Sequence, residues 1–221
     1  MAVKLLISTA YLPTVEYFSL VADAEEIFIE KEENYIKQSY RNRCYILSAH
    51  GPQLLTVPVY LGSVHKTLIK DIRIDYSKRW QQVHLRAMNA SYNSSPYFEF
   101  YFEGIENIIL KNHEYLIDLN MAVMEKILQN LKIKKTISYS SVFEPIEDMP
   151  YDFRYKITPK IRSSFAQKPY IQVFDTGKGF IPCLSIIDLI FNMGPEAGEW
   201  ITGLNIAHCN KEITQADSLD R

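Results

Sequence analysis

Residues 3–29 read VKLLISTAYLPTVEYFSLVADAEEIFI, and this stretch decides how the chain folds. The apolar run from Val3 to Ile7 predicts a buried strand. Residues 15–22 carry apolar side chains at helical spacing, just after Pro13, which suits the first turn of a helix. Residues 27–29 predict a second strand. This strand–helix–strand order predicts an α/β fold, in which helices pack on a mixed sheet.

A polar, cationic stretch, YIKQSYRNR, follows at residues 35–43. If the stretch is extended, Lys37, Arg41 and Arg43 point to one face. Guanidinium groups offer paired donors that fit a phosphate, a diphosphate or a carboxylate. We therefore predict a binding site for an anionic ligand here, with the phenol of Tyr40 and the amide of Asn42 in the same block.

The ends of the two predicted strands bear on this prediction, because ligands of α/β sheets gather beyond the carboxyl ends of strands. Residues 8–11 lie at one such end and residues 30–33 at another. Tyr11 could reach a ligand with its hydroxyl or pack over the sheet edge. The glutamates at 30, 32 and 33 offer the alternative to an anion site, namely salt bridges to the arginines, and a merely exposed basic edge is equally open. No glycine-rich phosphate loop is present, and no cofactor is predicted.

Beyond residue 43, the pattern predicts a helical middle segment at roughly residues 78–132 with strands on either side. Strands are expected at 44–47, 54–59, 69–76, 136–143, 170–174 and 180–184, the last two as a hairpin, and helices at 78–92, 97–110, 116–131, 185–194 and from Pro195. Asn120 intrudes on an apolar helix face and needs a hydrogen-bond partner if it is buried. Ser185 and Asp188 have the spacing of a capping box.

His84 is the candidate catalytic residue. It falls within the apolar stripe of the helix predicted at 78–92, between Trp80 and Met88. A histidine in such a place is more often a satisfied core residue than a catalyst. Histidine is, however, the side chain best suited to move protons near neutral pH. If the helix packs over the strand of Arg43, His84 could act as a general base for a hydroxyl or an amine.

Composition narrows the class of protein. The chain has 221 residues, 47% of them hydrophobic, which suffices for a substantial core, and we expect one domain at 1–209 followed by a polar tail at 210–221. With 24 basic and 26 acidic side chains, it lacks the basic footprint of a nucleic-acid binder. Its three widely spaced cysteines signal neither a disulfide framework nor a metal site. Without an apolar run of about 20 residues, no membrane span is expected, and a cytoplasmic location is the default.

Several short motifs, taken in order, resemble the WbqC-like protein family. They are Ile7–Pro13 with Tyr17 and Phe18, the Tyr40–Arg43 block, Trp80 with His84 and Leu85, and Tyr92 followed by Ser95–Phe98. The later motifs, Gly179–Pro182, Leu184–Ile186, Asp188–Leu189 and Gly194–Pro195, resemble a Bacteroidetes-type branch. The chain departs from the family at Ile7–Ser8–Thr9, where His-Gln-Pro often stands.

The resemblance implies a role in the biosynthesis of surface polysaccharide of the O-antigen type, and a transferase that moves an acyl or aminoacyl group to a sugar. The anionic ligand would then be a sugar nucleotide or an acyl donor. The resemblance carries over no established catalytic residue. The alternative is a non-catalytic ligand-binding or assembly protein, which would use the cationic face or the aromatic run at 97–102. Neither resemblance nor composition indicates the oligomeric state.

Overall fold

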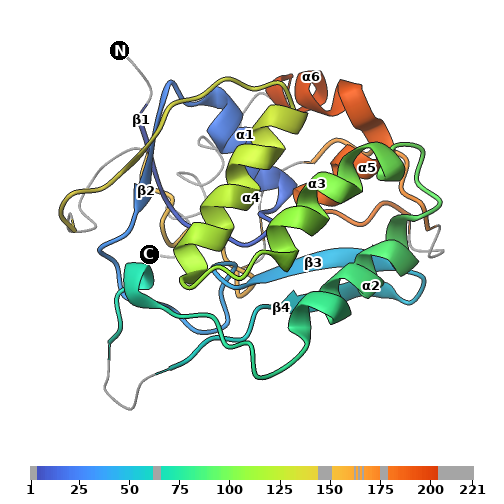
Figure 1. Cartoon of the computed structure of the whole chain (residues 1–221). Coiled ribbons are helices and arrows are strands. Elements are labelled where there is room, and N and C mark those ends of the chain that lie inside the picture. The colour runs from blue at the N-terminus through green and yellow to red at the C-terminus, as the bar shows by residue number, and fades with distance from the viewer. Residues whose placement is uncertain are drawn as a thin grey trace, which may run out of the picture.

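The computed structural model describes residues 4–61, 66–143, 151–161, 163, 165, 167–174 and 179–203. It is a mixed α/β fold (Figure 1). The strands are β1 (Lys4–Ser8), β2 (Glu26–Glu30), β3 (Arg43–Ser48), β4 (Gly51–Thr56) and β5 (Ile137–Tyr139). The α-helices are α1 (Val15–Asp23), α2 (Trp80–Tyr92), α3 (Phe98–Leu110), α4 (Leu116–Asn130), α5 (Ile186–Met193) and α6 (Ala197–Thr202), and short 3₁₀ turns lie at Ile69–Asp71 and Gly194–Glu196.

The first sheet confirms the expected strand–helix–strand opening. Its three strands are parallel and lie in the order β1–β2–β5. One face is apolar and buried, with Leu5 and Ile7 of β1 beside Ile27 and Ile29 of β2. Figure 1 shows α1 and α4 beside this sheet. Because both strands run the same way, their carboxyl ends meet at one edge.

The second sheet is the antiparallel hairpin of β3 and β4, with α2 along it (Figure 1). A turn at residues 49–50 joins the two strands, and Gly51 adopts a φ of 108°, a conformation that favours glycine. The helical middle segment is also confirmed as α2, α3 and α4. Asn120 of α4 is buried and has the partner it needs, because its Nδ2 donates to the backbone carbonyl of Arg41 at 2.8 Å.

Two predicted strand regions are wrong. Residues 69–76 form a 3₁₀ turn and then isolated bridges, Val59 with Ile74 and Arg73 with Tyr115. The alternation of apolar residues there reflects separate partners and not one continuous ladder. The predicted hairpin at 170–184 has no strands among its described residues. The side-chain amide of Gln172 takes the place of the expected strand–strand hydrogen bonds. Its Nε2 donates to the carbonyl of Ile181, and its Oε1 accepts from the N–H of Ile181. Residues 175–178 lie outside the described part.

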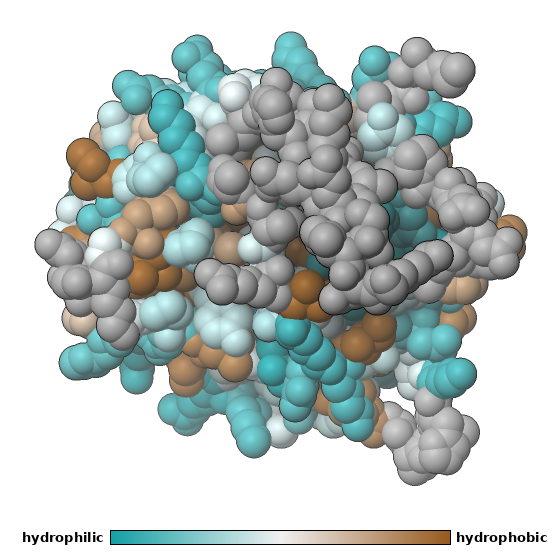
Figure 2. Space-filling model, turned by 180° about the vertical axis from the view of Figure 1, so that it is seen from behind, coloured by the Kyte–Doolittle hydropathy of each residue, from teal (hydrophilic) through white to brown (hydrophobic). Residues whose placement is uncertain are grey.

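The surface mixes small apolar areas with hydrophilic side chains, as Figure 2 shows for the face opposite that of Figure 1. Isolated exposed apolar residues are normal for a folded chain. Among the described residues, no helix combines the length and the apolar character that crossing a bilayer requires.

Candidate functional site

Ser8 and Glu30 mark the carboxyl ends of β1 and β2, and they pair in the register of the sheet. The chain therefore brings residues 8–11 and 30–33 to one edge, as the strand pattern predicts. A third segment joins them there. Residues 151–153 run along β1. The N–H of Leu6 donates to the carbonyl of Tyr151, and the carbonyl of Leu6 accepts from the N–H of Phe153.

Six residues from these segments form what we call the strand-end cluster: Ser8, Glu30, Glu33, Arg41, Asp152 and Arg154. Arg41 grips Glu33 with two donors, Nε at 2.8 Å and Nη2 at 2.5 Å, and its Nη2 also donates to the hydroxyl of Ser8 at 2.8 Å. Arg154 pairs with Glu30 at 2.9 Å and with Asp152 at 2.6 Å. All five charged side chains are buried.

Burying five charges in one place works against stability, because desolvation offsets much of the attraction between ion pairs. Such clusters are therefore candidates for functional sites, although structural networks also contain them. Burial raises the pKa of Glu33, and Arg41 offsets this effect only partly. Burial also opposes the ionisation of Asp152, but the hydrogen bonds from Arg154 outweigh it and lower the Asp152 pKa. The cluster thus holds two carboxyl groups with opposite shifts.

The predicted extended cationic face does not form. Residues 37–41 make a turn, in which Gln38 takes a left-handed φ of 59° and the Ser39 hydroxyl bonds the carbonyl of Ile36. Lys37 is exposed, Arg41 turns inward to Glu33, and Arg43 begins β3. The three cations therefore share no strand face. For Arg41, the alternative of a salt bridge to Glu33 is the one that the structure contains.

Arg43 differs from Arg41. Within the described residues its guanidinium makes no ion pair or hydrogen bond, and its buried Nε has no acceptor. The phenol of Tyr35 lies within electrostatic reach of both arginines: burial raises its pKa, and the charges of Arg43 and Arg41 act in the opposite direction. Arg43 is thus a half-buried cation whose Nε has no acceptor among the described residues, two positions along the chain from Arg41 of the strand-end cluster.

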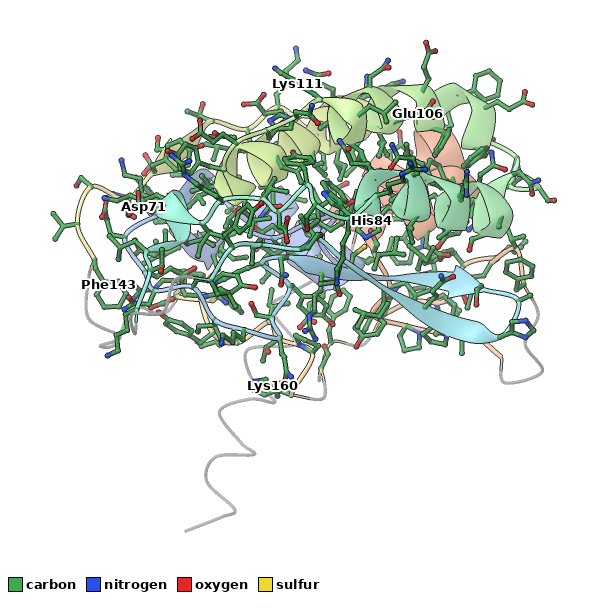
Figure 3. All side chains as sticks on the ribbon, turned by 60° about the horizontal axis from the view of Figure 1, so that its bottom comes forward. Asp71, His84, Glu106, Lys111, Phe143 and Lys160 are labelled. Atoms are coloured by element: carbon green, nitrogen blue, oxygen red, sulfur yellow. The ribbon has the colours of Figure 1, made fainter. Side chains whose placement is uncertain are left out.

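His84 occupies a buried position between α2 and the β3–β4 hairpin (Figure 3). The hydroxyl of Tyr11 lies 3.0 Å from its Nδ1, its ring packs against Trp80, and it bonds the backbone of Thr56. Burial lowers its pKa to about 4, so the ring is neutral at pH 7. In the described residues no hydrogen bond links His84 to the strand-end cluster. Tyr11 connects the two regions indirectly: its hydroxyl contacts His84, and its backbone N–H donates to the carbonyl of Tyr40, the residue before Arg41, at 2.9 Å.

Of the remaining predicted site residues, Asn42 stabilises the backbone of the turn and Tyr40 lines a small cavity. Asn42 is buried and donates to the carbonyl of Val57 at 2.8 Å, so its amide ties the turn to the residue that follows β4. Tyr40 is half-buried and lines a cavity of about 10 Å³ together with Ser8, Thr9 and Arg41. This volume is at the lower limit for one water molecule. The buried hydroxyl of Thr9 has no hydrogen-bond partner in the described part of the chain.

Sequence reasoning missed Asp152 and Arg154. They fall in the polar segment between the strand predicted at 136–143 and the hairpin predicted at 170–184, and loops of this length are often functional. No spacing rule connects that segment to Glu30, which lies 124 residues from Arg154. Among the described residues, no group of histidine, cysteine and acidic side chains is arranged to hold a metal ion.

Comparison with known proteins places the chain in a family. A model of the WbqC-like protein family matches residues 9–164, which include most of the strand-end cluster. A protein of Mycobacterium tuberculosis, described as uncharacterised, is 26% identical over 222 aligned positions that cover 89% of this chain and 96% of the relative. No solved structure matches the chain. The family match ends before Gly179, so the Bacteroidetes-type branch stays a prediction.

Proposed function

Since the chain belongs to the WbqC-like protein family, we propose that it is a transferase-like enzyme of cell-surface glycan biosynthesis, acting in the cytoplasm. The reaction would move an acyl or aminoacyl group to a sugar. Its site would lie at the carboxyl ends of β1 and β2, and Arg43 would bind the anionic part of a sugar nucleotide or an acyl donor.

The observation that carries this proposal is the buried Nε of Arg43, which has no acceptor among the described residues and lies two positions along the chain from the buried, paired Arg41. A cation without a counter-ion favours an anionic ligand, and a guanidinium matches phosphate or carboxylate with two donors. The pairing of Arg41 with Glu33 holds a second guanidinium close to Tyr35, on which both arginine charges act. Arg41 thus serves to position the site, and Arg43 to contact the ligand.

Two groups with shifted pKa values could accept the proton of a sugar hydroxyl or an amine. Glu33 is one of them: it lies in the strand-end cluster, 3.1 Å from the Ser8 hydroxyl, and both of its oxygens accept from Arg41. Its raised pKa brings a carboxyl closer to the range that general bases use. His84 remains the second candidate, but Tyr11 and Thr56 already occupy its ring nitrogens.

Binding of inorganic diphosphate and of a uridine diphosphate sugar, followed by calorimetry, tests the anion site. Arg43→Ala is expected to weaken binding at least tenfold, because it removes the charge-assisted donors. The matched control is Arg86→Ala, which removes an exposed arginine of α2. Unchanged binding by Arg43→Ala, or equal losses in both variants, would refute the proposed anion site.

A second candidate function is that of a non-catalytic binding or assembly protein. The favouring observation is Phe100 of α3, which is 78% exposed, while Phe98 is buried and Tyr101 and Phe102 are half-buried. Val83 of the neighbouring α2 is 59% exposed. Phe100→Ser would then abolish partner association while leaving diphosphate binding intact, which separates this function from the enzyme.

A further inference from the structure

The face of the parallel sheet turned away from the buried core carries a pocket. Alternate residues of β1 and β2 point to opposite faces, and Leu5, Ile7, Ile27 and Ile29 point into the core. The intervening residues, Lys4 and Leu6 of β1 with Phe28 and Glu30 of β2, line a pocket of about 240 Å³. Residues 139–142 and Tyr151 complete its described lining.

The walls of this pocket are aromatic and partly exposed. Tyr139 is 45% exposed and Tyr151 is 36% exposed, whereas most large aromatic side chains of this protein pack in its core or against it. Lys4 Nζ lies 6.0 Å from the ring centre of Phe28, and Lys31 Nζ lies 5.8 Å from that of Tyr139. Lysines at the rim disfavour a cationic ligand, because like charges repel. Exposed ring faces instead suit the flat face of a ring-shaped ligand.

The polar side of the pocket is formed by Glu30 and Ser140, which hydrogen bonds hold in place. The carboxylate of Glu30 is fully buried and is held by Arg154 at 2.9 Å and by the backbone N–H of Glu32 at 2.8 Å. It also accepts a hydrogen bond from the Ser140 hydroxyl at 2.5 Å. Ser140 Oγ also accepts from Lys31 N–H at 3.1 Å, so its second lone pair remains for a hydroxyl of a ligand. The exposed Ser141 stands beside it in the lining.

These features together select a class of ligand. Ligand pockets are mostly apolar with a few placed polar groups, and they span about 300–1,000 Å³ for drug-sized molecules. This one is smaller, which fits a single ring better than a whole nucleotide. Aromatic walls, a hydroxyl acceptor and lysines at the rim fit an uncharged ring that carries hydroxyls.

We propose that the pocket between the open face of β1 and β2 and residues 139–142 binds an uncharged sugar ring. This inference rests on the proposed function only in making that sugar the acceptor of the transfer. Glu30 connects the two sites, because it lies under the pocket and pairs with Arg154 of the strand-end cluster. His84 lies away from this part of the molecule. Figure 3 shows it well apart from Phe143, whose ring centre lies 5.0 Å from the Arg154 guanidinium.

Saturation-transfer NMR with methyl glucoside and N-acetylglucosamine tests the pocket directly. The wild type is expected to bind at least one of them. Tyr139→Ala is expected to weaken binding at least fivefold, because it removes a stacking face, and Tyr139→Phe is expected to retain it, because it keeps the ring. Phe100→Ala removes an exposed aromatic ring outside the pocket and serves as the matched control.

Three outcomes would decide against the pocket or its ligand, and another would separate the pocket from the anion site. If the wild type binds neither sugar, or if Tyr139→Ala binds as well as Tyr139→Phe, the pocket is not a sugar site. If uridine binds there and the sugars do not, the ligand class is wrong. Arg43→Ala must leave sugar binding intact. If the wild-type protein binds a sugar but not diphosphate, the proposed anion site is refuted and the sugar pocket is not.

Discussion

Arg41 and Arg43 lie two residues apart but differ in what surrounds them. Arg41 is buried and bound to Glu33 by two donors, so Arg41→Ala leaves a buried carboxylate without its counter-ion. Breaking such a pair typically costs about 3–5 kcal/mol. Arg43→Ala removes no ion pair to any described residue and is expected to cost less than about 1 kcal/mol. Urea denaturation of both variants measures the difference.

The double variant Glu33→Leu/Arg41→Met provides the control for this prediction. It removes both charges, so no buried group loses its counter-ion, and replacing a buried pair by apolar residues is often neutral. We expect it to be more stable than Arg41→Ala. A double variant as unstable as Arg41→Ala would mean that the cost arises from packing and not from the uncompensated charge.

The neutral state of His84 predicts a dependence of stability on pH. In the unfolded chain His84 takes up a proton near pH 6.5, whereas in the folded chain it does so only near pH 4. The unfolded state therefore binds more protons between these values, and stability falls as the pH decreases from 6.5 to 4. The full shift corresponds to about 3 kcal/mol.

The pH dependence of unfolding by urea, compared between wild type and His84→Gln, measures this contribution. The variant cannot titrate at this position, so the free-energy difference between the two proteins should shrink as the pH falls through the window. His50→Gln, which alters an exposed histidine of the β3–β4 turn, should follow the wild type. Parallel curves for wild type and His84→Gln would contradict the assignment.

At the residue scale, the chemistry of the site was predictable but its pairing was not. The sequence offers three glutamates near a strand end as salt-bridge partners for Arg41 and Arg43 and leaves open whether they pair. Which glutamate is taken depends on Arg154, which occupies Glu30 from a distant part of the chain and leaves Glu33 for Arg41. Local spacing carries no information about such a contact. The role of His84 could not be predicted either, because a histidine in the apolar stripe of a helix can be a buried core residue or a catalyst. Its burial, which lowers its pKa, is seen only in the structure.

At the element scale, Asp188 shows how a helix start can be misinterpreted. Ser185 caps α5 as predicted, with its hydroxyl accepting from Ile187 N–H. Asp188 does not complete a capping box. Its buried carboxylate instead accepts from the hydroxyls of Tyr92 and Tyr170 at 2.9 and 2.6 Å and from Gln172 at 3.0 Å. It thereby joins α2, α5 and the segment after residue 169.

Asp188→Ala is expected to destabilise the protein by roughly 3 kcal/mol, because the buried Tyr92 hydroxyl and two half-buried donors lose their acceptor. Tyr170→Phe removes one donor and leaves the carboxylate two, so a loss of about 1 kcal/mol is expected. Denaturation in urea gives both values. Equal losses in the two variants would show that the carboxylate itself contributes nothing beyond its bond to Tyr170.

Elements with a strong period were the predictable ones. The helices of the middle segment follow apolar residues at helical spacing, and their bounds differ from the prediction by only a few residues. The region at 170–184 failed for a physical reason: a side-chain amide can satisfy the same backbone groups as a neighbouring strand, and the hydropathy pattern cannot distinguish the two. The alternation at 69–76 was likewise produced by burial against unrelated partners.

At the scale of the whole molecule, α5 and α6 belong to the same core as the part that matches the family. The match ends at residue 164, yet α5 is buried along most of its length and contacts α1, α3 and β3, while α6 contacts α1. One contiguous core predicts one cooperative unit, so the prediction of a single domain can be tested by unfolding.

The two tryptophans offer probes in different parts of this core, Trp80 in α2 and Trp200 in α6. Trp200→Phe leaves only Trp80 to report, and Trp80→Phe leaves only Trp200, which packs against Tyr170. In each variant, the urea midpoint from fluorescence is expected to coincide with that from far-ultraviolet circular dichroism, because a two-state domain loses all its structure together. Comparing the two signals within one variant removes the effect of the substitution itself. A Trp200 transition at lower urea than the dichroism midpoint would show that α5 and α6 unfold separately, and the domain would then divide near the end of the family match.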